Sequence, residues 1–380
     1  MDAPRSLQPT AGQLALADAL IRGEQSLGTT ITTVPASVYI DPDRFAAEQA
    51  NIFGKLPLLL APSALLSHAD RAVTHDDYGV PVIVSRDHDG TAHVLANVCR
   101  HRGTRLLTSD DEDPLPATRI VCPYHAWTYR SDGSLLGLPR AECFPGLDKN
   151  EHGLMRFPTH ECGGLIWFSR NPDDDFSAIE PVCEDFDAFG VADHFLYKRK
   201  THEVAANWKM VIDAFLEAYH VQRLHASTIA SFFADGITVA DRIADHQRAV
   251  VGRADYLVGV DCNDWPALRR AVTFTYHLFP NTIVVVSPDY INIMVVTPQS
   301  VGHCLVEDFM LIAEEPQTNE AEAHWKRSWD LLDGATFAGE DFAAAELCYR
   351  GLVSGLQKET LLGTLEAGLA DFHARVDSYL

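Results

Sequence analysis

The spacing of apolar side chains divides the chain into helical and extended regions. In residues 11–22 and 38–52 the apolar positions recur with a helical period, which predicts two short helices. From about 53 to 170, short apolar runs such as 80–84 alternate with turn sequences such as Asp132-Gly133. Asp-Gly between apolar runs is typical of a β-hairpin, so this region is predicted to be a small all-β domain.

The second half of the chain predicts a different arrangement. The acidic, proline-containing segment 171–187 is expected to be a linker. Runs rich in Val, Ile, Thr and Phe predict four strands, at 272–278, 282–287, 291–297 and 303–313. Helices are predicted on either side of them, at 207–221, 319–333 and 339–377. A helix, antiparallel strands and long helices together indicate an α+β domain.

Length and charge restrict the partners that the chain can have. It has 380 residues and a formal net charge of −23. The length predicts two or three domains, and the acidity disfavours nucleic acid and anionic membranes as partners. The N-terminus lacks the basic start and unbroken apolar stretch of a signal peptide, and no run approaches the roughly 18 apolar residues of a membrane helix. We therefore expect a soluble, cytoplasmic protein.

Eight cysteines are scattered along the chain rather than concentrated in a small domain. In a reducing compartment, this distribution favours metal ligands and buried free thiols over a disulfide framework.

Two short motifs in the predicted β domain combine cysteine with histidine. Cys99 and His101 are separated by one residue, and Cys122 and His125 by two. Each spacing lets one tight turn direct both side chains at a single centre. The four ligands suit either one tetrahedral zinc or a [2Fe–2S] cluster with both cysteines on one iron and both histidines on the other. Zinc-binding loops usually pair Cys with Cys or His with His. Here each loop carries one Cys and one His, which favours the [2Fe–2S] cluster.

A second group of candidate ligands lies in the predicted helix at 207–221 and just beyond it. Glu217 and His220 are three residues apart and would share a helix face. His225 lies about 140° further around an ideal helix, so it can join His220 at one metal only if the helix ends or bulges between them. Two imidazoles and a distant carboxylate would form the facial triad that leaves positions open on Fe(II) for O2 and substrate. A His-x4-His pair alone is more often packing or surface.

These motifs resemble those of Rieske non-haem iron oxygenases over about residues 40–375. NVCRHRGTRLL and CPYHAWTY resemble the cluster loops CxHRG and CPYHxW. Residues 207–225 resemble NWKxxxxxFLExYHxxxxH, and residues 339–352 resemble the C-terminal helix EDxxxxExxxxGL. The polar segment 109–116, an expected surface loop, makes the gap between the two cluster loops slightly longer than is usual in the family.

The resemblance implies three regions and two metal centres. An N-terminal helical segment (1–52) would pack on a helix-grip catalytic domain (171–380) with an antiparallel sheet and long helices, and a Rieske [2Fe–2S] domain (53–170) would lie between them in the chain. The cluster ligands would be Cys99, His101, Cys122 and His125. The mononuclear Fe(II) ligands would be His220, His225 and Asp341, with the adjacent Glu340 as the alternative to Asp341.

The resemblance also implies a route for electrons. Family members form head-to-tail homotrimers, in some cases with a small beta subunit, and the cluster of one subunit faces the iron of the next. Glu217 would bridge His101 of one subunit and His220 of another. Many members have Asp at this position, and Glu recurs in members that act on quaternary amines. A second departure is Asp213-Ala214, where many members have Glu-Asn.

The expected function is that of a terminal oxygenase, which takes electrons from a NAD(P)H-dependent reductase or ferredoxin. It would hydroxylate or dihydroxylate a small organic substrate, with aromatic compounds as the expected class. The alternative is a monooxygenase that carries out O- or N-demethylation or oxidises a quaternary amine. Two other functions, an electron carrier and a ligand-binding protein stabilised by zinc, would leave more of the sequence motifs unexplained. Substrate-pocket residues are expected within 226–310, including Phe232, Phe233, Asn292 and Met294.

Overall fold

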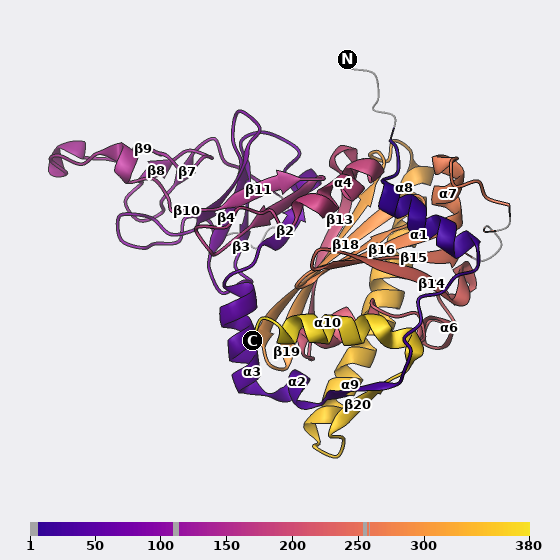
Figure 1. Ribbon diagram of the computed structural model, residues 1–380. Helices are drawn as coiled ribbons and strands as arrows, with labels where there is room; N and C mark the ends of the chain where they lie inside the picture. The colour runs from indigo at the N-terminus through magenta and orange to yellow at the C-terminus, as the bar shows by residue number, and fades with distance from the viewer. Residues whose placement is uncertain (1–6, 109–113, 254–256, 258) are drawn as a thin grey trace.

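The N-terminal region of the computed structural model consists of short elements that lie against the C-terminal half of the chain (Figure 1). The structure describes residues 7–108, 114–253, 257 and 259–380. Helix α1 begins after Thr10, which forms a capping box with Gln13. The helix predicted at 38–52 is interrupted because Asp41 caps a new helix that opens at Pro42. The elements are α1 Ala11–Ile21, β1 Thr32–Pro35, α2 Ser37–Ile40, α3 Pro42–Glu48 and the π-helical η1 Gln49–Phe53.

The predicted all-β domain is confirmed and contains three small antiparallel sheets. Their strand orders are β10-β5-β4-β3-β6, β11-β12-β2 and β7-β8-β9. Of the expected loop 109–116, residues 109–113 lie outside the described residues, and β6 pairs with β3 as a short strand. The elements are β2 Leu58–Pro62, η2 Ser63–Leu66, β3 Arg71–His75, β4 Val82–Arg86, β5 Ala92–Ala96, β6 Leu115–Pro116, β7 Ile120–Val121, β8 Thr128–Tyr129, β9 Leu135–Gly137, η3 Ala141–Cys143, η4 Lys149–Glu151, β10 Arg156–Phe157, β11 Thr159–Cys162 and β12 Leu165–Phe168.

The prediction of a linker at 171–187 is wrong in part, because this segment contains the start of a helix. Helix α4 (Glu180–Phe189) buries Val182 and Phe186. The structure also joins Cys162 to Cys183 by a disulfide, with their Cα atoms 5.6 Å apart. The expectation of free thiols and metal ligands alone therefore needs correction for this pair.

A seven-stranded antiparallel sheet forms the centre of the C-terminal domain, with the order β13-β19-β18-β17-β16-β15-β14. The four predicted strands are confirmed, and three more precede them. The strands are β13 Phe195–Val204, β14 Phe233–Ile243, β15 His246–Arg253, β16 Val272–Leu278, β17 Thr282–Val286, β18 Tyr290–Ser300 and β19 His303–Ile312. The helices before and between them are η5 Val191–Asp193, α5 Trp208–Ala214, α6 Val221–Leu224, η6 Ala230–Phe232 and α7 Trp265–Ala271.

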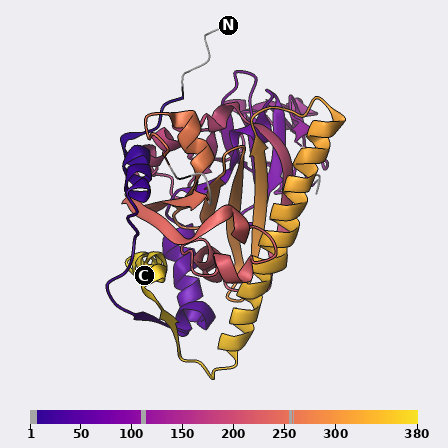
Figure 2. The same cartoon turned by 90° about the vertical axis from the view of Figure 1, so that its right-hand side faces the viewer.

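The C-terminal helices differ from the prediction in where they break. Helix α8 (Asn319–Trp329), the π-helical η7 (Asp330–Phe342) and α9 (Ala343–Val353) follow one another without a gap, and Figure 2 shows them as one long helix beside the sheet. The predicted break near 334–338 is therefore absent. Instead the chain leaves the helix after α9, and β20 (Glu359–Leu362) pairs with β1. Helices η8 (Thr364–Glu366) and α10 (Ala367–Asp377) end the chain.

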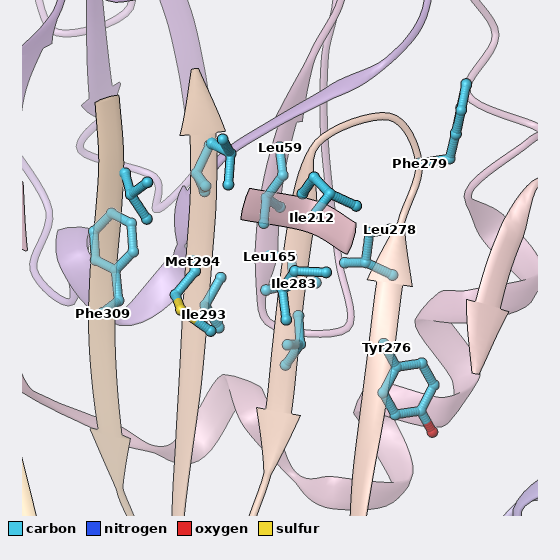
Figure 3. Close-up of a cluster of buried hydrophobic side chains, with 14 of the residues drawn as sticks. Leu59, Leu165, Ile212, Tyr276, Leu278, Phe279, Ile283, Ile293, Met294 and Phe309 are labelled. Atoms are coloured by element: carbon cyan, nitrogen blue, oxygen red, sulfur yellow. The ribbon is translucent and has the colours of Figure 1, made fainter. Parts of the chain in front are cut away.

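One hydrophobic core joins the two domains. Leu59 and Leu165, from the β domain, belong to the same cluster of buried side chains as Ile283 and Ile293 of the large sheet. Figure 3 shows these side chains together with Ile212, which lies on α5 across the strands. Within the described residues, no helix combines the length and apolar character needed to cross a membrane.

Candidate metal centres

Two tight turns of the β domain carry the Cys/His motifs. After β5, the N–H of Gly103 donates to the carbonyl of Cys99 at 2.9 Å, and a φ of 74° at Gly103 permits the turn. Between β7 and β8, the N–H of Ala126 donates to the carbonyl of Cys122 at 3.0 Å. The turns bring His101 and His125 together, with ring centroids 4.6 Å apart.

The four side chains fit a [2Fe–2S] cluster. Cys99 and Cys122 are buried free thiols. The Nδ1 atoms of His101 and His125 are also buried, and no described residue hydrogen-bonds to them. Buried polar atoms are normally satisfied, so this set of thiols and ring nitrogens is what a bound metal centre would require.

The electrostatics favour metal-binding protonation states. Burial and the neighbouring His125 lower the pKa of His101, which keeps its imidazole neutral. Burial alone would raise the pKa of the Cys122 thiol, but the backbone N–H groups of Tyr124 and His125 outweigh it and lower that pKa. A thiolate and a neutral imidazole are the ligand forms of these residues.

A second centre forms where α6 approaches η7. The ligand atoms of His220, His225 and Asp341 lie within 4.8 Å of one another. The Asp341 Oδ1 atom lies 3.2 Å from His225 Nε2 and 3.6 Å from His220 Nε2. This oxygen is buried and accepts no hydrogen bond from any described residue. The donor set and the unsatisfied oxygen fit a mononuclear Fe(II) with open positions.

Each histidine of this group is oriented by a glutamate. Glu217 Oε1 lies 2.5 Å from His220 Nδ1, and Glu340 Oε2 lies 2.6 Å from His225 Nδ1. Both rings therefore direct Nε2 towards Asp341, as in the carboxylate–histidine–metal arrangement. Burial opposes the charged form of His225, but Asp341 and Glu340 outweigh it and raise its pKa. The carboxylates thus make the centre attractive to a cation.

The helix that was predicted at 207–221 ends early, before the first of the two histidines. Helix α5 ends at Ala214 and α6 begins at Val221. Glu217 lies in the turn between them, where its Oε2 accepts the N–H groups of Tyr219 and His220. The expectation that Glu217 and His220 share a helix face is therefore wrong, and their contact comes from the turn.

Glu340 has a role that sequence reasoning did not find. It was weighed only as a replacement for Asp341, yet it lies outside the ligand group and contacts His225 and Thr228. Glu340 and Asp341 belong to the π-helical η7, and π-helical turns are frequent at functional sites. The two adjacent carboxylates in Glu340-Asp341 were the feature of the sequence that could have indicated this role.

A cavity of about 430 Å³ opens beside the second centre. One face is a row of cross-strand neighbours that runs over five strands: Ala240, Ala249, Thr275, Val285 and Asn292. The other side includes His220, His225 and Asp341, together with residues of η7 and α10 that sequence reasoning missed.

The expected pocket residues are found at the cavity with one exception. Phe232, Phe233 and Asn292 line it. Met294 does not line it, and its side chain is buried in the hydrophobic core instead (Figure 3). The cavity volume lies in the range of small-molecule sites.

Two family models match the chain. A Rieske [2Fe-2S] domain matches residues 58–158, and the catalytic domain of the ring hydroxylating alpha subunit matches residues 194–380. The chain belongs to the Rieske non-haem iron oxygenase family. The expected cofactor classes, a [2Fe–2S] cluster and a non-haem iron, are those of the two matched domains.

Several family members are similar in sequence. The carnitine monooxygenase oxygenase subunit of Escherichia coli strain K12 is 30% identical over 213 residues, which are 54% of each protein. Putrescine 2-hydroxylase of Bordetella bronchiseptica is 32% identical over 208 residues, 51% of this chain and 46% of that protein. The alignments thus span about half the length of these curated relatives.

Solved structures share the fold over nearly the whole chain. The quaternary ammonium Rieske monooxygenase CntA matches with a TM-score of 0.80 and 20% identity, covering 98% of this chain and 99% of that one. Naphthalene 1,2-dioxygenase from a Rhodococcus species matches with a TM-score of 0.75 and 18% identity, over 97% and 98% of the two chains.

Proposed function

We propose that this protein is the terminal component of a monooxygenase system and that its substrates are small amine compounds. The observation that carries the proposal is that one chain holds both candidate centres and that the His220/His225/Asp341 group borders a cavity of about 430 Å³. An electron carrier would need the first centre alone, and it would need no such cavity.

The proposed overall reaction converts a substrate C–H bond, O2, two electrons and two protons into C–OH and water. The electrons come from a NAD(P)H-dependent reductase or ferredoxin. When bound, the cluster would pass on single electrons and the mononuclear iron would bind O2. Cys99, His101, Cys122 and His125 would hold the cluster, and His220, His225 and Asp341 would hold the iron.

The chain's own residues would prepare the site for this reaction. Glu217 and Glu340 hold the rings of His220 and His225 with Nε2 towards Asp341. The sheet wall and η7 would enclose a bound substrate and limit the access of water to it. The protein would thus position the substrate and exclude water from it.

The placement of the two candidate centres supports a proposal of electron transfer between subunits. In Figure 1 the β7–β9 sheet lies at one end of the molecule and α6 near the other. The cluster loops reach the surface, where the Tyr124 side chain is exposed. We infer a head-to-tail trimer, in which Glu217 links His220 to His101 of another subunit. One matched structure is described in terms of inter-subunit electron transfer.

Amines are preferred over aromatic substrates for two reasons. The relatives similar in sequence are named for carnitine, glycine betaine and putrescine, whereas the likeness to naphthalene 1,2-dioxygenase is one of fold. The cavity is also lined by polar side chains such as Thr275 and Asn292. The aromatic substrates expected from the sequence are therefore our second candidate.

The test is a substrate screen with a surrogate reductase. A panel of primary, secondary and quaternary amines and of aromatic compounds is scored for O2 uptake and product mass, with Asp341→Ala as the matched inactive control. We expect uptake coupled to an amine product with one added oxygen atom, in the wild type alone. Coupled formation of aromatic diols with no amine turnover would overturn the amine assignment.

A further inference from the structure

Arg253 is a positively charged residue of the cavity wall that no described carboxylate neutralises. It is the last residue of β15 and lines the cavity. Within the described chain, its guanidinium has no hydrogen-bond or ion-pair partner. Arg248, which lines the same cavity, is paired instead with Asp185 and Asp241, at 2.7 and 2.6 Å. The donors of Arg253 are therefore available to a ligand.

The guanidinium of Arg253 is also accessible. The side chain is only half-buried. None of its nitrogen atoms belongs to the buried polar atoms of the described residues that lack a partner. A molecule in the cavity can therefore reach its N–H groups.

Two aromatic rings hold this guanidinium in place. Its central carbon lies 5.8 and 5.9 Å from the ring centroids of Phe232 and Phe233, and Phe233 is also the cross-strand neighbour of Arg253. Gln222, on the short helix between the two candidate iron histidines, donates to the carbonyl of Phe233 at 3.0 Å. A guanidinium that packs on aromatic rings keeps its fork of N–H donors for an anion. These contacts tie its position to that of the second metal centre.

The other charges of the wall indicate which anion fits. One guanidinium matches a carboxylate, which it can bind through two parallel N–H···O bonds. No described lysine lines the cavity, and Asp289 and Asp371 line it without an ion-pair partner in the described chain. These carboxylates disfavour a dianion such as phosphate and attract a positive group on the same molecule. The wall thus suits a small zwitterion.

We propose that the substrates of this cavity carry a carboxylate as well as an amine, and that Arg253 binds the carboxylate and determines this specificity. The rest of the molecule then extends along the sheet wall towards the His220/His225/Asp341 group. The inference rests on the proposed function, since it narrows the substrate class of that site. An amide in place of the carboxylate would leave the guanidinium without its anion, and charge-assisted hydrogen bonds are about twice as strong as neutral ones.

Calorimetric binding to the full chain, with both metal centres loaded, tests the proposal without requiring turnover. The probes are ω-amino acids of three to six carbons, each paired with its amide, which has nearly the same size and shape. Benzoate and benzamide form one further pair that lacks the amine. We expect the acid of at least one amino-acid pair to bind at least about tenfold more tightly than its amide in the wild type.

Variants of Arg253 assign the preference to its guanidinium. Arg253→Met keeps much of the length without the charge and should reduce the ratio to about threefold or less. Arg253→Gln, which is polar but neutral, should do the same and covers the case in which Arg253→Met fails to fold. Arg253→Lys keeps the charge but loses the fork of donors, so its ratio should be intermediate. The matched control is Arg242→Met, at an exposed arginine that also lines the cavity, and it should keep the wild-type ratio.

The outcomes separate this inference from the proposed function. Equal binding of acid and amide in every pair would overturn the inference, as would a wild-type ratio in Arg253→Met and Arg253→Gln. A loss of the preference in Arg242→Met alone would overturn the assignment to Arg253. Preference for benzoate over benzamide with no binding of any amino acid would uphold the carboxylate site and overturn the amine assignment. Carboxylate-selective binding by a protein that never consumes O2 would overturn the proposed function alone.

Discussion

Glu340 Oε2 and His225 Nδ1 lie 2.6 Å apart, so the residue next to the candidate ligand Asp341 orients a different ligand. Thr228 also donates to Glu340, at 2.6 Å, which fixes the carboxylate in place. The two neighbours in η7 therefore have separate roles at one centre.

This separation predicts different iron affinities for two variants. Asp341→Ala should lose the mononuclear iron, because it removes a ligand. Glu340→Gln should retain iron but bind it about 10–100-fold more weakly, the usual effect of losing an orienting partner. Iron per chain after dialysis against graded chelator measures both. Full iron in Asp341→Ala together with complete loss of iron in Glu340→Gln would mean that Glu340 is the ligand and Asp341 the orienting residue.

The cluster should be removable without loss of the second centre. Cys99→Ala should abolish the Rieske-type EPR signal and the brown colour, because Cys99 supplies one thiolate. Cys143→Ala is the matched control, since Cys143 is an exposed free cysteine. The mononuclear iron should persist in both variants. A Cys99→Ala protein with an intact EPR signal would refute the ligand assignment.

Glu217 should affect electron delivery more than metal content. Glu217→Gln should keep both centres nearly full, while steady-state turnover falls by at least about tenfold. Electron transfer in a single turnover should slow by a similar factor, and Glu217→Asp should be intermediate because it keeps the charge but shortens the reach. Glu203→Gln, at a side chain that is 82% exposed, is the control. Full activity in Glu217→Gln, or an active monomer, would indicate another route for electrons.

A buried ion pair ties the N-terminal segment to α5. Lys209 Nζ donates to both oxygens of Glu48, at 2.7 and 2.8 Å, and both side chains are almost fully buried. Glu48→Gln should cost about 3–5 kcal/mol in the free energy of unfolding, because it leaves a buried ammonium unpaired. The double variant Glu48→Gln/Lys209→Met should recover part of that loss in urea unfolding at pH 7. A single variant as stable as the wild type would contradict this.

The same pair predicts how stability depends on pH. Burial lowers the pKa of Lys209 to about 8, against an ordinary value of 10.5, although Glu48 opposes the shift. Between these values the unfolded chain binds more protons than the folded one, so this group's contribution to the free energy of unfolding rises with pH from about 8 to 10.5. In Lys209→Met this rise should be absent, which urea unfolding across that pH range would reveal.

The sequence predicted the elements whose pattern is local. Strands β16–β19 were found because their apolar runs are nearly uninterrupted. Strand β13, with the sequence FLYKRKTHEV, was missed because its polar side chains take partners that are distant in sequence, such as Glu307 for Arg199. The Cys162–Cys183 disulfide depends on how β11 meets α4, which no spacing reveals.

The candidate metal centres were predictable to the extent that their ligands follow motifs. The spacing of His220 and His225 required the helix to end or bulge between them, and the short helix α6 (Val221–Leu224) ends before His225. The partners that complete the site come from far along the chain. Glu340 contacts His225 because η7 lies beside α6, and Asp308 contacts Asn292 because β19 pairs with β18. Contacts of this kind cannot be predicted from a local sequence pattern.

Metal and sulfide analysis of the wild-type protein tests the central claim, that one chain holds a cluster and a separate mononuclear iron. We expect about three irons and two acid-labile sulfides per chain, with a Rieske-type EPR signal on reduction. Asp341→Ala should remove about one iron and leave the sulfide and the EPR signal unchanged. A colourless protein that contains zinc and no sulfide would contradict the account, as would an Asp341→Ala variant with the same iron content as the wild type.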